Sequence, residues 1–150
     1  MKFNRIAFRL KPPDPMHQDL INQIKQLVTQ QPENLLLRFL LADHLLENGS
    51  LDQAKQEFQE ILNQTQNTHI LSRAGLARID FLKESYQTCR QTLEMLISVG
   101  FADLNVRLLY ARCLLKQSKL YEACQQYRNV VALDPFFRDP ELEEIRFACP

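Results

Sequence analysis

Small residues recur along this chain at a spacing that suits a pair of helices. Ala54, Cys89 and Ala123 lie 35 and 34 residues apart. Twelve residues before each of them is an alanine, and four residues after each is a large apolar or aromatic residue; these are Ala42, Ala77, Ala111, Phe58, Leu93 and Tyr127. Copies of this length must stack, because one pair of helices cannot bury its own apolar face. The spacing therefore predicts an all-α solenoid.

The stretch 104–135 indicates that each copy is a helical hairpin. Apolar residues fall at helical spacing over its first half, and a second amphipathic run follows a short polar break at 117–119. The second run ends at Asp134-Pro135, where proline cannot continue a helix. Two helices joined by so short a link must lie antiparallel.

Over roughly residues 18–135 the chain resembles the tetratricopeptide-repeat (TPR) family. The third copy carries the family pattern most fully, in Tyr110, Ala111, Leu114, Ala123, Tyr127, Val130 and Pro135. The second copy departs from it, with Asp80 where a large apolar residue or tyrosine is usual and with no closing proline. The resemblance implies a right-handed α-α superhelix of about three hairpins, over residues 35–68, 70–101 and 104–135.

Capping helices are expected at both ends of a repeat domain spanning 14–150. Asp14-Pro15 predicts the start of an N-terminal cap helix over 14–31, and Asp139-Pro140 predicts a C-terminal helix over 140–148. Residues 1–13 form a basic N-terminal arm whose pattern suits a helix or a strand. We expect the arm to lie on the domain or to be disordered, with a docking segment as the alternative.

Composition excludes several classes of partner. The chain has 18 Lys and Arg against 18 Asp and Glu, so its net charge gives no attraction to nucleic acid or to an anionic membrane. No stretch approaches the ~20 apolar residues of a membrane span. The four cysteines show no CxxC spacing. We therefore expect reduced thiols in a cytoplasmic protein.

No catalytic constellation is evident. His17, His44 and His69 lie in different predicted helices without HxxxH or HExxH spacing, and no phosphate-binding glycine loop is present. The sequence therefore predicts no enzyme activity, no metal site and no cofactor.

The family resemblance implies a partner-binding groove lined by the first helix of each hairpin. The residues at the corresponding positions are Leu36, Phe39, Asp43, Leu46, Leu71, Ala74, Arg78, Phe81, Asn105, Leu108, Arg112, Leu115 and Lys116. Arg78 and Arg112 share one register and would present planar donors to a carboxylate. The alternative for these arginines is solvated ends or ion pairs with Asp43 and Asp80, and for Phe39 and Phe81 it is the core between repeats. The family's clamp on a C-terminal carboxylate is not expected here, because Phe39 and Asp43 stand where a basic residue and an asparagine are needed.

The resulting hypothesis is a non-catalytic protein–protein interaction module. Its partner would be a protein or peptide of apolar and acidic character. One alternative is the partner-recruiting or regulatory N-terminal region of a larger protein, such as an ATPase. A second is self-association into a homo-oligomer through Phe136-Phe137 or the arm at 1–11. A third, an RNA-binding helical repeat, is disfavoured by the neutral charge.

Overall fold

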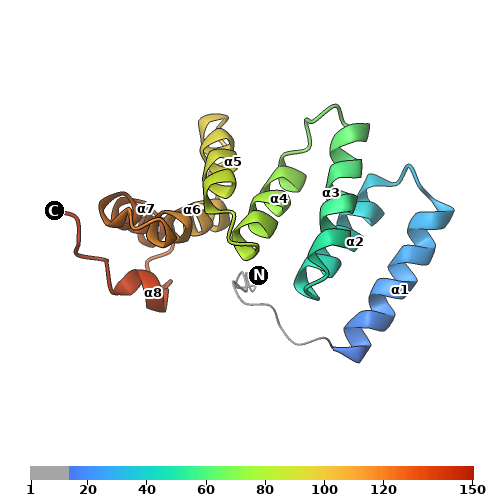
Figure 1. Ribbon diagram of the computed structural model, residues 1–150, viewed down its shortest axis with the longest axis horizontal. Helices are drawn as coiled ribbons and strands as arrows, with labels where there is room; N and C mark the ends of the chain where they lie inside the picture. The colour runs from blue at the N-terminus through green and yellow to red at the C-terminus, as the bar shows by residue number, and fades with distance from the viewer. Residues whose placement is uncertain (1–13) are drawn as a thin grey trace. The chain divides into compact units, whose positions relative to one another are not determined.

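The computed structural model describes residues 14–150, and over these residues it is entirely helical and contains no strand (Figure 1). The expectations for the arm at 1–13 lie outside the described residues. The helices are α1 (Pro15–Gln30), α2 (Leu35–Glu47), α3 (Leu51–Gln64), α4 (Ile70–Leu82), α5 (Tyr86–Ser98), α6 (Leu104–Lys116), α7 (Leu120–Leu133) and α8 (Pro140–Glu143). The expected all-α class is confirmed.

Side-chain caps fix where several helices begin. Asp14 precedes Pro15, the first residue of α1, and its carboxylate accepts a hydrogen bond from the N–H of Met16. The side chains of Asn34 and Asp103 cap α2 and α6 by accepting from backbone N–H groups in the same way. Such a cap satisfies a backbone donor that has no partner within the helix. The last helix, α8, is capped by Asp139 but ends at Glu143, so it is shorter than the expected 140–148.

The turn after the first helix of each expected hairpin has the same local conformation. Gly49, Glu84 and Ser118 have φ of 81°, 60° and 59°. They recur at 35 and 34 residues, which is the period of the sequence repeat. Only Gly49 adopts this left-handed conformation without a steric cost. The backbone therefore repeats with the sequence even where the residue type does not.

The chain divides into two compact units, the first ending at Leu82 and the second running from Lys83 to Pro150. We call them the N-terminal unit and the C-terminal unit. The boundary falls inside the repeat expected over 70–101, so the pairing of α4 with α5 in one hairpin stays a prediction. Within each unit, helices adjacent in sequence pack against each other, as in a TPR-like superhelix.

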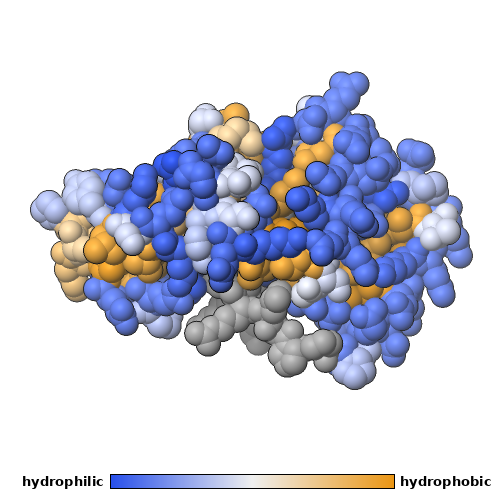
Figure 2. Space-filling model, viewed as in Figure 1, coloured by the Kyte–Doolittle hydropathy of each residue, from blue (hydrophilic) through white to orange (hydrophobic). Residues whose placement is uncertain are grey.

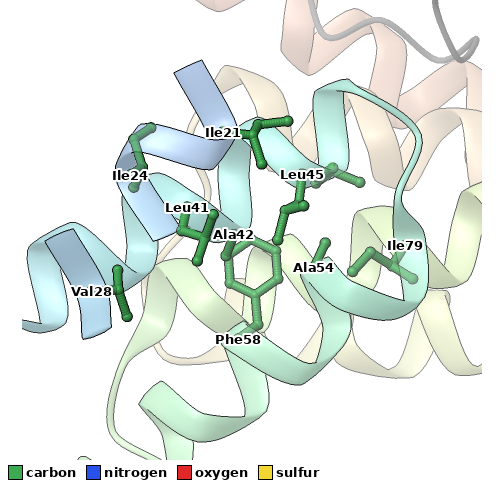
Figure 3. Close-up of a cluster of buried hydrophobic side chains, with 10 residues drawn as sticks. Ile21, Ile24, Val28, Leu41, Ala42, Leu45, Ala54, Phe58 and Ile79 are labelled. Atoms are coloured by element: carbon green, nitrogen blue, oxygen red, sulfur yellow. The ribbon is translucent and has the colours of Figure 1, made fainter. Parts of the chain in front are cut away.

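In the N-terminal unit, α2 packs against α1, α3 and α4. Figure 3 shows the side chains of this core pointing toward one another from all four helices, with the ring of Phe58 among them. The core residues are Ile21, Ile24, Val28, Leu41, Ala42, Leu45, Leu46, Ala54, Phe58 and Ile79. Gly75 permits this packing, because a Cβ there would lie 2.5 Å from Cζ of Phe58. Gly75 is thus a site of close approach between α4 and α3.

In the C-terminal unit, α6 packs against α5 and α7, and α8 packs against both α6 and α7. Its most deeply buried residues include the repeat residues Cys89, Leu93, Ala111, Ala123 and Tyr127. The short α8 therefore covers the last hairpin, which places acidic side chains beside α6.

Candidate partner-binding surface

The first helices of the two repeats in the N-terminal unit carry exposed apolar side chains. Leu36 on α2 is 77% exposed and Leu71 on α4 is 48% exposed. Leu40 and Ile70, on the same two helices, are also exposed. Since α2 and α4 pack against each other, these side chains belong to neighbouring helices of one unit. Figure 2 shows that the face in view is mostly hydrophilic, with apolar areas set into it.

Phe39 lies at the edge of the core. Its ring centroid is 5.8 Å from that of Phe58 and 5.6 Å from that of His69, and it is half-buried. Much of its surface is thus used in packing within the chain. This agrees with the core alternative for Phe39, although part of the ring remains accessible.

Arg78 lies in the electrostatic field of two carboxylates. Burial lowers the pKa of Arg78, and the neighbouring Asp43 and Glu47 on α2 partly oppose this by raising it. Burial and the neighbouring Glu47 raise the pKa of Asp43, while Arg78 and His44 lower it. Within residues 14–150, Nε of Arg78 is buried without a hydrogen-bond partner. Asp43 and Arg78 are thus near each other, on α2 and α4.

Three predicted groove residues are buried. Leu46, Phe81 and Leu108 each expose 6% of their surface or less. Side chains with so little exposure offer no contact area to a partner, so they stabilise the packing of helices instead. Burial of Phe81 agrees with the alternative that it belongs to the core between repeats. Burial of Leu46 and Leu108 differs from the expectation that they line the groove.

Arg112 on α6 is engaged by the chain itself. Its Nε and Nη2 both donate to Oδ2 of Asp139, at 2.9 and 2.6 Å, and Nη1 lies 3.6 Å from Glu141. Lys116, one turn further along α6, donates to Glu141 at 3.1 Å. Asn105 and Leu115 on the same helix are half-buried. Arg112 and Lys116 were expected to offer their positive charges to a partner. They bind instead the acidic side chains at the start of α8.

Asp139 is held in place by several further bonds. It is 3% exposed. Its Oδ1 accepts from the N–H groups of Glu141 and Leu142, and its own N–H donates to the hydroxyl of Tyr127. The Tyr127 hydroxyl in turn donates to Glu143. Burial and this bond raise the pKa of Tyr127 to about 12, and the same bond lowers the pKa of Glu143. The sequence predicted the cap at Asp139, but no local signal could have indicated the bond to Arg112.

The cysteines differ from the expectation of four reduced thiols. Cys124 on α7 and Cys149 form a disulfide, with Cα atoms 5.9 Å apart, a usual span for this bond. Cys89 and Cys113 are buried and lie outside this disulfide. The thiol of Cys113 donates to the carbonyl oxygen of Tyr86 at 2.9 Å. The disulfide joins the C-terminal segment to α7. Two of the four cysteines are therefore not reduced thiols, and they no longer support the expected cytoplasmic location.

Two histidines that seemed unrelated in sequence come together. Nε2 of His17 on α1 lies 3.3 Å from Nδ1 of His44 on α2, whereas His69 caps the start of α4 through the N–H of Ser72. A search for HxxxH spacing could not find this pair, since its members are 27 residues apart.

The packing of successive antiparallel helices defines a helical-repeat protein. A family model described as tetratricopeptide repeat matches residues 21–79, which run from α1 into α4. The match confirms the TPR resemblance over these residues, and such repeats generally mediate protein–protein interaction. TPR proteins are typically non-catalytic. No curated protein matches the chain. Among residues 14–150, no helix is long and apolar enough to cross a membrane.

Proposed function

We propose that the chain is a non-catalytic binding module that holds a peptide or helix of a partner protein on the face formed by α2 and α4. The observation that carries this proposal is the exposure of Leu36 and Leu71 on two adjacent first helices. Large apolar side chains exposed on neighbouring helices are typical of interaction sites. Burying Leu36 against a partner would contribute up to about 1.5–3 kcal/mol, and burying Leu71, which is already half-buried, would contribute less.

Arg78 supplies the polar part of the proposed surface. It is a half-buried guanidinium on α4, near Asp43 and Glu47, and within residues 14–150 its Nε has no hydrogen-bond partner, whereas Nε of Arg112 donates to Asp139. A partner carboxylate could accept hydrogen bonds from its terminal nitrogens. The proposed ligand is therefore an amphipathic segment with two apolar anchors and at least one acidic residue.

A selected peptide tests the proposal. Peptides that carry two leucines at helical spacing and one glutamate would be selected against the full chain, and their affinity measured by fluorescence anisotropy. We expect Leu36→Ser/Leu71→Ser to weaken binding by at least about tenfold, which corresponds to about 1.4 kcal/mol. Leu133→Ser, a change at an exposed leucine of α7, is the matched control. Equal loss in both variants, or no loss in either, would contradict the proposal.

Charge reversal tests the arginine separately. Arg78→Glu should weaken binding of an acidic peptide more than that of its Glu→Gln counterpart. Lys55→Glu, on the exposed side of α3, makes the same charge change elsewhere in the unit and should affect both peptides alike. If the two charge reversals have equal effects, Arg78 has no direct role.

Self-association is a second candidate, favoured by one observation. The aromatic ring of Phe136 is 93% exposed and that of Phe147 is 84% exposed. Sedimentation over a range of concentrations would show whether the chain forms dimers, and Phe136→Ser should shift the equilibrium to the monomer. A monomer at all concentrations would rule this candidate out.

A further inference from the structure

His17 and His44 meet between α1 and α2 in the N-terminal unit. Their nearest ring nitrogens are 3.3 Å apart, and the rings meet edge to face with centroids 5.1 Å apart. His17 belongs to the first turn of α1 and His44 to the second half of α2. Packing of the cap helix on the first repeat thus brings together two imidazoles from separate helices.

Glu47 adds an oxygen ligand beside the two histidines. It follows His44 by three residues, and residues three apart lie on the same face of a helix. One ligand atom from each of His17, His44 and Glu47 lies within 4.8 Å of the other two, and all three side chains are half-buried. The cluster therefore combines two nitrogens and a carboxylate oxygen at the edge of the core.

We propose that His17, His44 and Glu47 bind a divalent transition-metal ion, for which Zn²⁺ is the best fit. Tetrahedral zinc with bonds of 2.0–2.1 Å to histidine places two nitrogen ligands about 3.3 Å apart. The two ring nitrogens have this separation. Two histidines and one glutamate are also a donor set that leaves a fourth position for water. Imidazole ligands favour zinc, copper and nickel over magnesium or calcium.

The surrounding charges are two carboxylates and one cation. Asp43 lies close enough to Glu47 for the two carboxylates to repel, and Arg78 acts on both. A surface hollow of about 450 Å³ is lined by His17 together with Asp14 and Asp19, so the histidine can be reached from solvent. Binding would join α1 to α2 and stabilise the N-terminal unit, because the metal binds only where its ligands are assembled.

Calorimetric titration of the full chain tests the site. After treatment with a chelator, the protein would be titrated with ZnCl₂ and, for comparison, with MgCl₂. We expect saturable binding of one zinc ion and none of magnesium. His17→Gln, His44→Gln and Glu47→Gln should each weaken zinc binding about tenfold or more. Glu33→Gln, at an exposed residue between α1 and α2, should leave it unchanged.

Cobalt spectroscopy identifies the ligands independently. Cys89 and Cys113 are the competing ligands, because they are thiols of the C-terminal unit outside the disulfide. Co²⁺ bound to nitrogen and oxygen gives d–d bands without a sulfur-to-cobalt charge-transfer band. We expect these bands in the parent protein and their loss in Glu47→Gln, a change that keeps the side-chain shape. The proposal is overturned by a charge-transfer band, by the absence of saturable zinc binding, or by parent-like binding in all three variants.

Discussion

The two units use the same repeat position in opposite ways. In the N-terminal unit, Leu36 and Leu71 are exposed, and Arg78 lies near Asp43 and Glu47. In the C-terminal unit, Arg112 stands in the same register as Arg78 but is bound by Asp139 at 2.6 Å. A residue type that recurs with the repeat therefore does not recur in role, since its role depends on what lies next to it.

The C-terminal unit also illustrates the chemistry that the N-terminal surface would recognise. A short acidic helix, α8, packs on α6 through its apolar Leu142, which is fully buried, and through carboxylates that meet Arg112 and Lys116. The segment is joined to α7 by the disulfide. An apolar anchor beside an acidic group is the ligand pattern proposed for α2 and α4.

Truncating the core of the N-terminal unit should have the largest effect. Phe58→Ala removes a side chain that is 1% exposed, and we expect the free energy of unfolding to fall by about 3–5 kcal/mol. Hydrogen exchange of amides in α2, α3 and α4 measures this loss. Amides of the C-terminal unit should keep their protection if the two units are separately stable.

Gly75 supplies an internal control for that prediction. In the parent protein, Gly75→Ala should destabilise the unit by about 1–3 kcal/mol, since the new Cβ meets the Phe58 ring. In the Phe58→Ala background the same change should be neutral or stabilising by up to ~1 kcal/mol, because alanine favours a helix over glycine. Equal costs in both backgrounds would show that the ring does not cause the clash.

Breaking the disulfide should weaken the C-terminal unit. Cys149→Ser opens a loop that begins 25 residues earlier, at Cys124, and we expect a loss of about 3 kcal/mol. All four tyrosines lie in the C-terminal unit, at 86, 110, 121 and 127, and the chain has no tryptophan. Tyrosine fluorescence during urea unfolding therefore reports this unit alone. A reductant should reproduce the loss in the parent and add nothing in the variant; parent stability that is unaffected by reductant would contradict the bond.

Removing the charge of Asp139 should have a smaller effect. Asp139→Asn keeps a capping side chain for α8 but removes the carboxylate that accepts two hydrogen bonds from Arg112, while the longer contact of Arg112 with Glu141 remains, at an expected cost of about 2 kcal/mol. Asp103→Asn is the matched control, since Asp103 caps α6 through the N–H of Val106. The comparison uses the same fluorescence-monitored unfolding. Equal changes in the two variants would assign the effect to capping alone.

Alkaline pH should weaken the C-terminal unit through its tyrosines. Burial raises the pKa of both Tyr110 and Tyr127 from 10.0 to about 12, assisted by hydrogen bonds to Glu94 and Glu143. The unfolded chain then loses these protons first, so stability is complete below pH 10 and falls as the pH rises toward 12. Urea unfolding followed by circular dichroism measures this decline. Tyr110→Phe/Tyr127→Phe should remove the part of it that belongs to these hydroxyls; an unchanged pH dependence would contradict their role.

The sequence predicted the features that depend on local pattern. The repeat of Ala42, Ala77 and Ala111 indicated the helical fold, and Asp-Pro pairs indicated where α1 and α8 begin. Contacts between distant segments could not be predicted in this way. The bond from Arg112 to Asp139 and the pair of His17 with His44 each join residues 27 positions apart. Cysteine spacing likewise cannot give the connectivity of a disulfide.

Helical spacing also could not separate the exposed groove positions from the buried ones. Leu36 and Leu46 lie on the same helix and were assigned to the same surface, yet one is 77% exposed and the other is buried. The difference arises because the second half of α2 is enclosed by other helices of its unit. Packing of neighbouring helices, which the periodicity of one helix does not reveal, decides this outcome.

The most direct test of this account is to map a bound peptide on the chain by NMR. An acidic peptide with two leucines, selected as above, would be titrated into isotope-labelled full chain while backbone amide shifts are recorded. We predict that the largest shifts lie in α2 (Leu35–Glu47) and α4 (Ile70–Leu82), and that α6 changes little because its Arg112 is already bound. Shifts confined to the C-terminal unit would contradict the central claim that the N-terminal unit provides the open surface.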